Sequence, residues 1–404
     1  MTSGLSFCMV TTFYPPQSFG GDGQYVARLS RALADRGHRV TVVHAPNAYE
    51  TLGGERHAAE PPYPGVTVKR LGSRLGVAAP LITYLTGRPG LHGGELRALL
   101  DDSALDVIHF HNVSLAGGAG VLEYGRAAKL YTTHEHWLVC PMHVLWKDNR
   151  EPCVEPHCVR CCLAFRRPPQ PWRWTNLRDR AAASVDLFLA PSQFAVDMHR
   201  QRGFRAPMRR LPLFVSDADA APAEPEEAVR PYFLVVGRLE PLKGVQQLVD
   251  LFRHYREADL VVAGEGSLDA RLRSAAADLP HIRFVGRLAF DRLRSLYAGA
   301  TAVIAASVGY ETFGLTTIEG FAQRTPAIVR DLGGLPEIVR ESGAGFVFRT
   351  DDELVDAMEA LRLDAGLRRR LGALGAQAFS DRWSERAHLD QYLGVVESTL
   401  AGRA

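Results

Sequence analysis

The amino-acid sequence predicts an α/β protein built from two doubly wound domains in tandem. The chain has 404 residues, which is long for a single hydrophobic core. Short buried strand patterns alternate with helical patterns in both halves of the chain, as in proteins with parallel sheets. This alternation is interrupted at 216–230, a segment rich in alanine, proline and acidic residues that lacks a core-forming pattern.

These observations set the expected domain boundaries. We expect an N-terminal domain over 1–215, a linker over 216–230 and a C-terminal domain over 231–383. Residues 384–404 are expected to form a terminal helix that could pack back on the N-terminal domain. Its apolar residues recur at helical spacing, at Leu389, Tyr392, Leu393 and Val396.

The N-terminal half begins with the order strand, loop, helix, strand, which is the βαβ unit of a parallel sheet. The expected elements are a strand at 5–13, a helix at 25–36 that ends at Gly37, and a strand in "HRVTVVHA". Residues 48–101 are poorly patterned. Further buried strands are expected at 106–111, 130–135 and 185–192.

The C-terminal half repeats this rhythm more regularly. Strands are expected at 232–239, 258–264, 282–286, 301–307 and 326–331. Helices are expected between them, near 244–256, 268–277, 291–299 and 316–323. Doubly wound domains bind ligands at the carboxyl ends of their strands, so two facing domains would place a ligand cleft between them.

Composition and charge narrow the possible functions. The formal net charge of +2 argues against a dedicated nucleic-acid surface. No run of 18 apolar residues occurs, and the N-terminus lacks a basic region and a cleavage site, so we expect a cytoplasmic protein. Arginine greatly outnumbers the four lysines, which suggests a bacterium with GC-rich coding.

Two cations flank the first strand–helix connection of the C-terminal half. In "VVGRLEPLKG", Arg238 follows a strand and Lys243 precedes a helix. A phosphate there would meet both cations and the helix N-terminus together. The alternative is that both are solvated surface charges, which are common.

The stretch "VGYETFGLTTIEG" places two glutamates eight residues apart, Glu311 in a loop and Glu319 inside the following helix. Backbone N–H groups at this helix start favour an anionic phosphate. Carboxylates accept hydrogen bonds from sugar hydroxyls, so one glutamate could hold a hexose and the other a ribose. The alternative is that Glu319 only complements the helix dipole.

Two further strand ends carry weaker signals. Gly264 in "AGEGS" would let a ligand approach the backbone closely, although a simple turn explains it equally well. In "FVGRL", the backbone groups of Arg287 and Leu288 could pair with the edge of a base.

The motifs "GRLEPLKG", "AGEGS", "FVGRL", "ETFGLTTIE" and "GGLPEIV", in this order, resemble those of the GT-B glycosyltransferases of family 4. This resemblance implies two Rossmann-like domains facing across a cleft, and retaining transfer from a nucleotide-activated sugar. It implies that Arg238 and Lys243 clamp the diphosphate, that Glu311 binds hydroxyls of the donor sugar, and that Glu319 holds the ribose. Backbone amides near Phe313, Gly314 and Leu315 would meet sugar and phosphate.

The resemblance also assigns residues of the N-terminal half. Gly20 and Gly21 in "SFGGDGQ" are similar to the family's glycine loop, which approaches the donor phosphate and the acceptor. The family places a histidine near the donor sugar in "TTHEHW", and we choose His134 as a catalytic residue. His109 and His111 could line the same cleft. The catalytic set is thus His134 with Arg238, Lys243 and Glu311.

Five cysteines fall within 23 residues, and clustered cysteines in a cytosolic chain favour metal binding over disulfides. We expect a structural zinc, with His157 as a further candidate ligand and free thiols or a redox pair as alternatives. The expected ligands are Cys140, Cys153, Cys158 and Cys161. Catalysis itself should need no metal, because Arg238 and Lys243 already balance the diphosphate charge.

Two other functions fit the same motifs. A nucleotide-sugar epimerase or a phosphorylase could use this fold, and so could a nucleotide-sugar sensor without catalysis. The acceptor is expected to be a hydroxyl of a polysaccharide, a lipid or a natural-product intermediate. A peripheral membrane contact is conceivable, although no basic amphipathic helix supports it.

Overall fold

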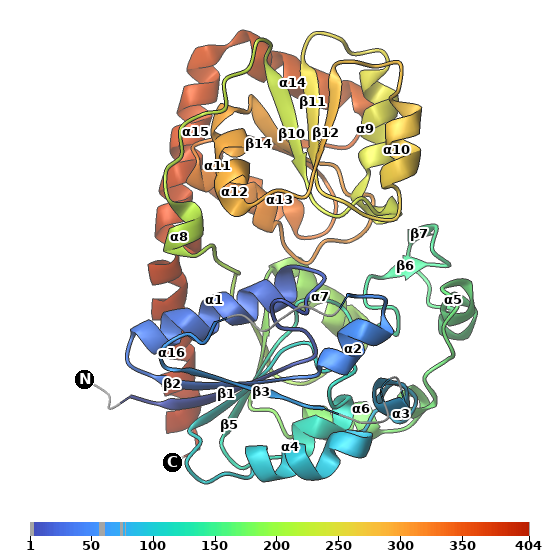
Figure 1. Cartoon of the computed structure of the whole chain (residues 1–404), viewed down its shortest axis with the longest axis vertical. Helices are drawn as coiled ribbons and strands as arrows, with labels where there is room; N and C mark the ends of the chain where they lie inside the picture. The colour runs from blue at the N-terminus through green and yellow to red at the C-terminus, as the bar shows by residue number, and fades with distance from the viewer. Residues whose placement is uncertain (1–3, 56–60, 73–75, 77, 404) are drawn as a thin grey trace. The chain divides into compact units, whose positions relative to one another are not determined.

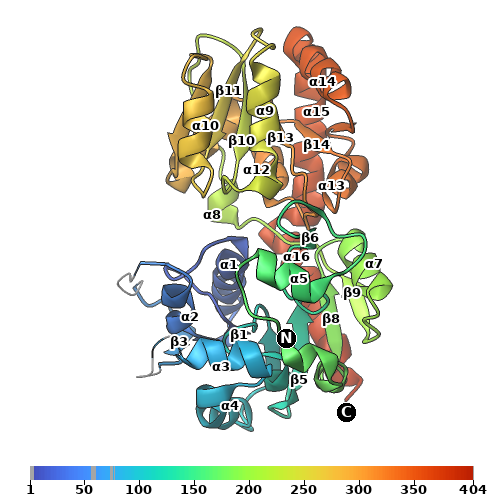
Figure 2. The ribbon, with the colours of Figure 1, turned by 90° about the vertical axis from the view of Figure 1, so that its right-hand side faces the viewer.

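The computed structural model describes residues 4–55, 61–72, 76 and 78–403. They form two compact units, each made from separate stretches of chain (Figures 1 and 2). Unit 1 contains the described residues up to His143, the stretch His157–Leu211, and those from Leu389 onward. Unit 2 contains Val144–Pro156 and Pro212–His388.

Unit 1 is built on a seven-stranded sheet in which all neighbouring strands are parallel. The strand order is β3-β2-β1-β4-β5-β8-β9, so the direction of winding reverses between β1 and β4. Helices α4 and α6 pack on one face of the sheet and α1 on the other (Figure 1). The strands are β1 (Ser6–Thr11), β2 (Arg39–His44), β3 (Val66–Arg70), β4 (Val107–Phe110), β5 (Ala128–Thr132), β8 (Leu187–Ala190) and β9 (Met208–Arg210).

Several helices of unit 1 lie in the poorly patterned part of the sequence. Residues 48–101 contain most of α2 and all of β3, α3 and α4. The edge strand β3 buries only Val66, and α4 buries only Leu96 and Leu100, so neither repeats an apolar pattern. The helices are α1 (Gly21–Asp35), α2 (Pro46–Thr51), α3 (Ala78–Thr86), η1 (Gly90–His92), α4 (Gly93–Leu100), η2 (Ala119–Glu123), α5 (Cys158–Ala164), η3 (Pro171–Trp174), α6 (Leu177–Ala182) and α7 (Gln193–Gln201).

Unit 2 is built on a six-stranded parallel sheet with the order β12-β11-β10-β13-β14-β15. Alternate residues of β10 point to opposite faces: Phe233 packs with α9, α10 and α14, whereas Leu234 packs with α11. Five strands coincide with the expected ones, and the sixth was not anticipated. The strands are β10 (Tyr232–Val236), β11 (Asp259–Ala263), β12 (Ile282–Gly286), β13 (Ala302–Ala305), β14 (Ala327–Arg330) and β15 (Gly345–Phe348).

The helices of unit 2 connect these strands and extend the chain beyond them. Those expected between the predicted strands are α9 (Val245–Phe252), α10 (Asp269–Ala275), α11 (Phe290–Gly299) and α12 (Leu315–Ala322). The others are α8 (Asp217–Ala220), the 3₁₀-helix η4 (Pro241–Lys243), α13 (Leu335–Ser342), α14 (Asp351–Leu363), α15 (Ala365–Ala378) and the π-helix η5 (Phe379–Trp383).

One segment of the N-terminal half belongs to unit 2, which was not expected. Val144–Pro156 forms a small antiparallel pair of strands, β6 (Trp146–Lys147) and β7 (Glu151–Pro152). The ring of Trp146 is buried beside Gly309, where an added Cβ would lie 3.5 Å from it. Apolar burial therefore holds this hairpin to the loop that follows β13.

The expected linker at 216–230 is not a free connection. It begins with α8, and its backbone is bonded to side chains of unit 2. Arg294 donates to the carbonyl of Ala218 at 2.8 Å, and Gln323 donates to the carbonyl of Ala221 at 3.0 Å. Polar side chains replace apolar packing here, which explains why the segment shows no core-forming pattern.

The terminal helix α16 (Glu385–Ala401) begins in unit 2 and belongs to unit 1 from Leu389 onward. Its Tyr392 is fully buried, and the hydroxyl lies 2.9 Å from Nδ1 of His109. Beyond the helix, Arg403 forms a 2.6 Å ion pair with Asp186. Across the described residues, no helix combines the length and apolarity needed to span a bilayer.

Candidate active site

The loop after β10 positions Lys243 in unit 2. Lys243 ends the 3₁₀-helix η4, and Gly244 then turns the chain into α9 with a φ of +73°. A Cβ at Gly244 would lie 2.0 Å from the carbonyl oxygen of Ala306, so only glycine fits. The absence of a side chain at Gly244 therefore lets the end of η4 lie directly against the end of β13.

The loop after β13 forms backbone hydrogen bonds with η4. The N–H groups of Val308 and Gly309 both donate to the carbonyl of Leu242, at 2.9 and 3.1 Å. Lys243 therefore lies beside Glu311, with Nζ 2.5 Å from Oε1. Ser307 Oγ donates to the same carboxylate oxygen at 2.6 Å.

The charge of Glu311 is set by opposing effects. Burial alone would raise its pKa, but Lys243, the Ser307 hydroxyl and the positive charge of Arg238 together hold the pKa below the ordinary value. The carboxylate is therefore ionised near neutral pH. Its backbone is also held in place, because the N–H of Gly334 donates to the Glu311 carbonyl at 2.7 Å.

Helix α12 begins directly after this loop. Gly314 is its N-cap, Phe313 before it is buried, and Leu315 is its first residue. The N-cap glycine supplies no side-chain cap to this helix start, so an anion could complement it. Glu319 lies in the second turn, where Oε2 accepts a 2.8 Å hydrogen bond from the hydroxyl of Tyr297.

The ends of β11 and β12 lie at the same edge of the sheet. Gly264 has a φ of +139°, and a Cβ there would lie 1.9 Å from the carbonyl oxygen of Gly237. The N–H of Arg287 donates to the Glu265 carboxylate at 3.3 Å, so a base would have to compete for this group. Leu288 is partly buried against the sheet.

These residues gather at the point where the winding direction of the sheet reverses. Lys243 follows β10 and Glu311 follows β13, and these adjacent strands flank the reversal. Arg238, which is exposed, is close enough to influence the pKa of Glu311. Ligands of doubly wound sheets bind at such switch points.

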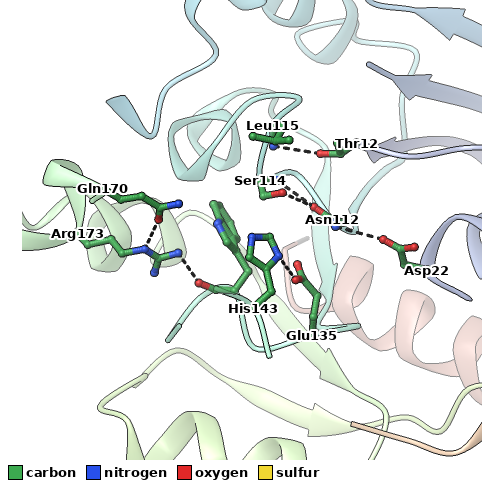
Figure 3. Close-up of polar contacts among 10 residues, drawn as sticks. Thr12, Asp22, Asn112, Ser114, Leu115, Glu135, His143, Gln170 and Arg173 are labelled. Carbon is green, nitrogen blue, oxygen red and sulfur yellow. Dashed lines mark hydrogen bonds and ion pairs between the residues drawn. The ribbon is translucent and has the colours of Figure 1, made fainter. Parts of the chain in front are cut away.

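Unit 1 presents a second polar cluster at its own reversal, between β1 and β4. Gly20 is the N-cap of α1 and Gly21 its first residue. In the next position, the Asp22 carboxylate accepts a 3.2 Å hydrogen bond from the amide of Asn112, which follows β4 (Figure 3). The Thr12 hydroxyl accepts from the N–H of Leu115, so the loops after β1 and β4 are tied together.

The histidines of unit 1 follow β4 and β5. His111 Nδ1 and His134 Nε2 lie 3.1 Å apart. Burial lowers the pKa of His134 to about 4, against the opposing influence of Asp22, and it lowers the pKa of His111 well below its usual value. Both rings are therefore neutral at pH 7. His109 bonds to Thr132 and to the terminal helix, which indicates a structural role.

The loop after β5 contains a hydrogen bond between side chains that the sequence did not reveal. The Glu135 carboxylate bonds to Nδ1 of His143, and the guanidinium of Arg173 donates to the carbonyl of Trp137 at 2.6 Å (Figure 3). Eight residues and a turn separate Glu135 from His143, so neither helical nor strand spacing indicates this pair.

Comparisons with known proteins identify the family to which this chain belongs. The model described as glycosyltransferase family 4 matches residues 19–219, and the model described as glycosyl transferases group 1 matches residues 218–377. D-inositol 3-phosphate glycosyltransferase of Acidothermus cellulolyticus is 30% identical over 95% of this chain and 87% of its own length. This chain is a group 1 glycosyltransferase.

Solved structures of other proteins share the fold of this chain. Sucrose-phosphate synthase of Thermosynechococcus elongatus superimposes with a TM-score of 0.73 at 18% identity, covering 98% of this glycosyltransferase and 100% of that chain. Anabaena Alr3699/HepE, solved in complex with UDP, gives a TM-score of 0.68 at 17% identity and the same coverage. The expected GT-B fold is confirmed.

The structure of the glycosyltransferase does not assemble the expected zinc site. Cys140, Cys158 and Cys161 lie in unit 1, whereas Cys153 lies in unit 2. Cys158 is exposed and the other three are buried. Among the described residues, no three histidine, cysteine or acidic side chains are grouped to hold a metal ion. The zinc, with His157 as a further ligand, stays a prediction without structural support.

Proposed function

We propose that this glycosyltransferase moves a sugar from a nucleoside-diphosphate donor to a hydroxyl acceptor with retention at the anomeric carbon. The observation that carries the proposal is the pairing of Lys243 with Glu311 at the switch point of unit 2, beside Arg238. Anabaena Alr3699/HepE, which shares the fold, has been solved with UDP and with UDP-glucose.

The charges of unit 2 suit a sugar diphosphate. The ammonium of Lys243 and the guanidinium of Arg238 would bind its phosphates, aided by the N-terminus of α12. The ionised Glu311 would accept hydrogen bonds from hydroxyls of the donor sugar, and Glu319 from those of the ribose. Gly264, Arg287 and Leu288, at the ends of the neighbouring strands, would lie along the nucleoside.

In the proposed reaction, the bond between the anomeric carbon and the diphosphate oxygen breaks. The acceptor oxygen forms its bond on the same face, and its proton passes to the leaving diphosphate oxygen. Lys243 and Arg238 stabilise the negative charge that develops on the diphosphate. The role proposed for the residues of unit 1 is to orient the acceptor: Gly20 and Gly21 by close backbone approach, and His134 as a neutral hydrogen-bonding ring.

A thermal-shift screen tests the donor assignment. UDP-, GDP-, ADP- and TDP-sugars are added to the intact protein, and the melting temperature is measured. A ligand that binds only the native state raises the melting temperature. At a concentration of 100 times its dissociation constant, it adds about 2.7 kcal/mol to the free energy of unfolding. We expect one base to be preferred. If no sugar nucleotide shifts the melting temperature, the proposal is overturned.

The reaction itself is tested with the preferred donor and a panel of hydroxyl acceptors, by NMR of the product's anomeric proton. Retained configuration supports the proposed course, and inverted configuration contradicts it. A sugar phosphate formed from donor and inorganic phosphate would identify a phosphorylase instead, and an epimerised donor would identify an epimerase. The cytoplasmic location and the bacterial source expected from the sequence stay predictions.

A further inference from the structure

Unit 1 contains a pocket that lies outside the residues assigned above to donor or acceptor chemistry. Its cavity volume is about 190 Å³, and it opens to solvent between α5, η3 and α6. We call it the arginine pocket. Its defining residues are Val139, Val159, Gln170, Arg173, Trp174 and Arg178.

Arg173 is held rigidly in this pocket. Its guanidinium carbon lies 4.5 Å from the ring centre of Trp172 and 5.6 Å from that of Trp137. Its Nε donates to the side-chain oxygen of Gln170, and Nη2 donates to the Trp137 carbonyl at 2.6 Å (Figure 3). Within the described stretches of the chain, Nη1 makes only a long contact of 3.5 Å, to the carbonyl of Leu138. The guanidinium is thus oriented before any ligand arrives, with donor capacity left on Nη1.

The charge of Arg173 is not neutralised within the part of the chain that the structure describes. Its hydrogen-bond partners are two carbonyls and an amide, and no carboxylate pairs with it there. Burial lowers its pKa to about 10, so it stays protonated near pH 7. A mostly buried cation without a counter-charge is costly, and an anion would relieve that cost.

The walls of the pocket indicate what the anion is attached to. Trp174 is 67% exposed, so one face of its indole is available for stacking. Val139 and Val159 add apolar surface, whereas Arg178, paired with Asp179 at 2.8 Å, adds a second guanidinium at the rim. A ring would stack on the indole while its charged substituent meets Arg173.

We propose that the arginine pocket binds a ring that carries a carboxylate or a phosphate, as the anionic end of the acceptor. Arg173 connects the pocket to the loop that carries His134, because the carbonyl it binds belongs to Trp137, three residues further along the chain. The acceptor role rests on the proposed glycosyl transfer, whereas the binding of an anionic ring does not.

Trp174 makes this binding directly measurable. The chain has five tryptophans, and the other four are all buried, at 6% exposure or less. Benzoate and phenyl phosphate are titrated into the intact protein at constant ionic strength, with benzyl alcohol and inorganic phosphate as partial ligands. Saturable quenching of tryptophan fluorescence by the two anionic rings is expected, and the tighter of the two identifies the charged group.

Three variants complete the test. Trp174→Phe should abolish the fluorescence change. Arg178→Gln should weaken binding roughly tenfold, as expected for loss of one charge-assisted hydrogen bond. Arg180→Gln is the matched control, because Arg180 lies on the same helix, pairs with Glu123 and does not line the pocket, so binding should be unchanged.

The outcomes separate this inference from the proposed function. Equal binding of benzyl alcohol and benzoate, or equal binding by wild type and Arg178→Gln, overturns the arginine pocket. A thermal shift with sugar nucleotides that persists in Arg178→Gln shows that the donor site is intact in that variant. If the anionic rings bind but no sugar nucleotide does, the pocket stands and the glycosyl-transfer proposal falls.

Discussion

At the scale of single residues, the loss of the Lys243 side chain should lower turnover most directly. Its Nζ contacts Glu311, and in the proposed reaction it stabilises the leaving diphosphate. Lys243→Ala should lower kcat by about 10²-fold, the usual cost of removing one electrostatic contact made in the transition state. Steady-state kinetics with the preferred donor measure this.

Lys69→Ala is the matched control, since Lys69 is exposed on the edge strand β3. Its kcat should equal that of the wild type. A Lys243→Ala enzyme with unchanged turnover would remove the diphosphate role of this lysine, even if the protein proves to be a glycosyl transferase by other tests.

A second residue-scale prediction concerns His134 and pH. Its pKa in the folded protein, about 4, lies below the ordinary value of 6.5 because the ring is buried. Between these values the unfolded chain binds a proton that the native ring does not, so this histidine lowers stability progressively as pH falls from about 6.5 to 4.

His134→Gln should therefore lose less stability than wild type over that interval, although other buried histidines act in the same direction in both proteins. We expect the difference in melting temperature between variant and wild type to change by roughly 5–10 °C in favour of the variant. About two pKa units are worth roughly 2–3 kcal/mol, and each kcal/mol shifts the melting temperature of a protein of a few hundred residues by about 2–4 °C. Melting curves at pH 7 and pH 4.5 give this difference, and parallel curves would mean that His134 titrates normally in the native state.

At the scale of helices and strands, the joint between η4 and α9 depends on one glycine. Gly244→Ala would place a Cβ 2.0 Å from the Ala306 carbonyl and force a φ of +73° on alanine. We expect a loss of about 1–3 kcal/mol in the free energy of unfolding, or a shift of the joint that separates Lys243 from Glu311.

Gly394→Ala in α16 is the opposite case, because nothing lies within 4 Å of its added Cβ and the helix gains propensity. It should be neutral or stabilising by up to about 1 kcal/mol. Denaturant unfolding of both variants measures the contrast. Equal stabilities would show that the close approach at Gly244 relaxes without cost.

The same scale shows what the sequence could predict. Helices such as α9 bury Val245, Leu248, Val249 and Phe252 on one stripe, so periodicity alone indicates them. The attachment of the segment 216–230 to unit 2 could not be predicted, because it depends on hydrogen bonds from Gln323 and Arg294, which lie far along the chain. Contacts between residues that are distant in sequence leave no local pattern.

In the candidate site too, residues in short local motifs could be predicted from the sequence, whereas contacts between distant residues could not. Arg238, Lys243, Glu311 and Glu319 could be named because they stand in short motifs at strand ends, and unit 2 brings Arg238, Lys243 and Glu311 together. The pairing of Glu135 with His143, and the contact of Arg173 with two indoles, arise only from tertiary folding. Cysteine spacing is a local signal, whereas a metal site requires its ligands to converge in space, so the zinc stays a prediction.

At the scale of the whole molecule, unit 1 is completed only by the last residues of the chain. From Leu389 onward α16 belongs to this unit, and it buries Tyr392, Val395 and Val396 there. The N-terminal strands therefore cannot bury their full apolar surface until the C-terminus has been added.

Tyr392→Ala tests this dependence. It removes a fully buried ring and the hydroxyl that bonds to His109, so we expect a loss of about 3–5 kcal/mol from unit 1. Tyr392→Phe, which keeps the ring and removes only the hydroxyl, should cost about 1–3 kcal/mol because Nδ1 of His109 loses its partner.

Since Tyr392 contributes nothing to the core of unit 2, the thermal shift produced by the preferred sugar nucleotide should persist in both variants below the temperature at which unit 1 melts. Limited proteolysis locates the loss: cleavage should accelerate first within the described residues of unit 1. Equal protection of both units in Tyr392→Ala would mean that the terminal helix stabilises the chain without completing the N-terminal fold.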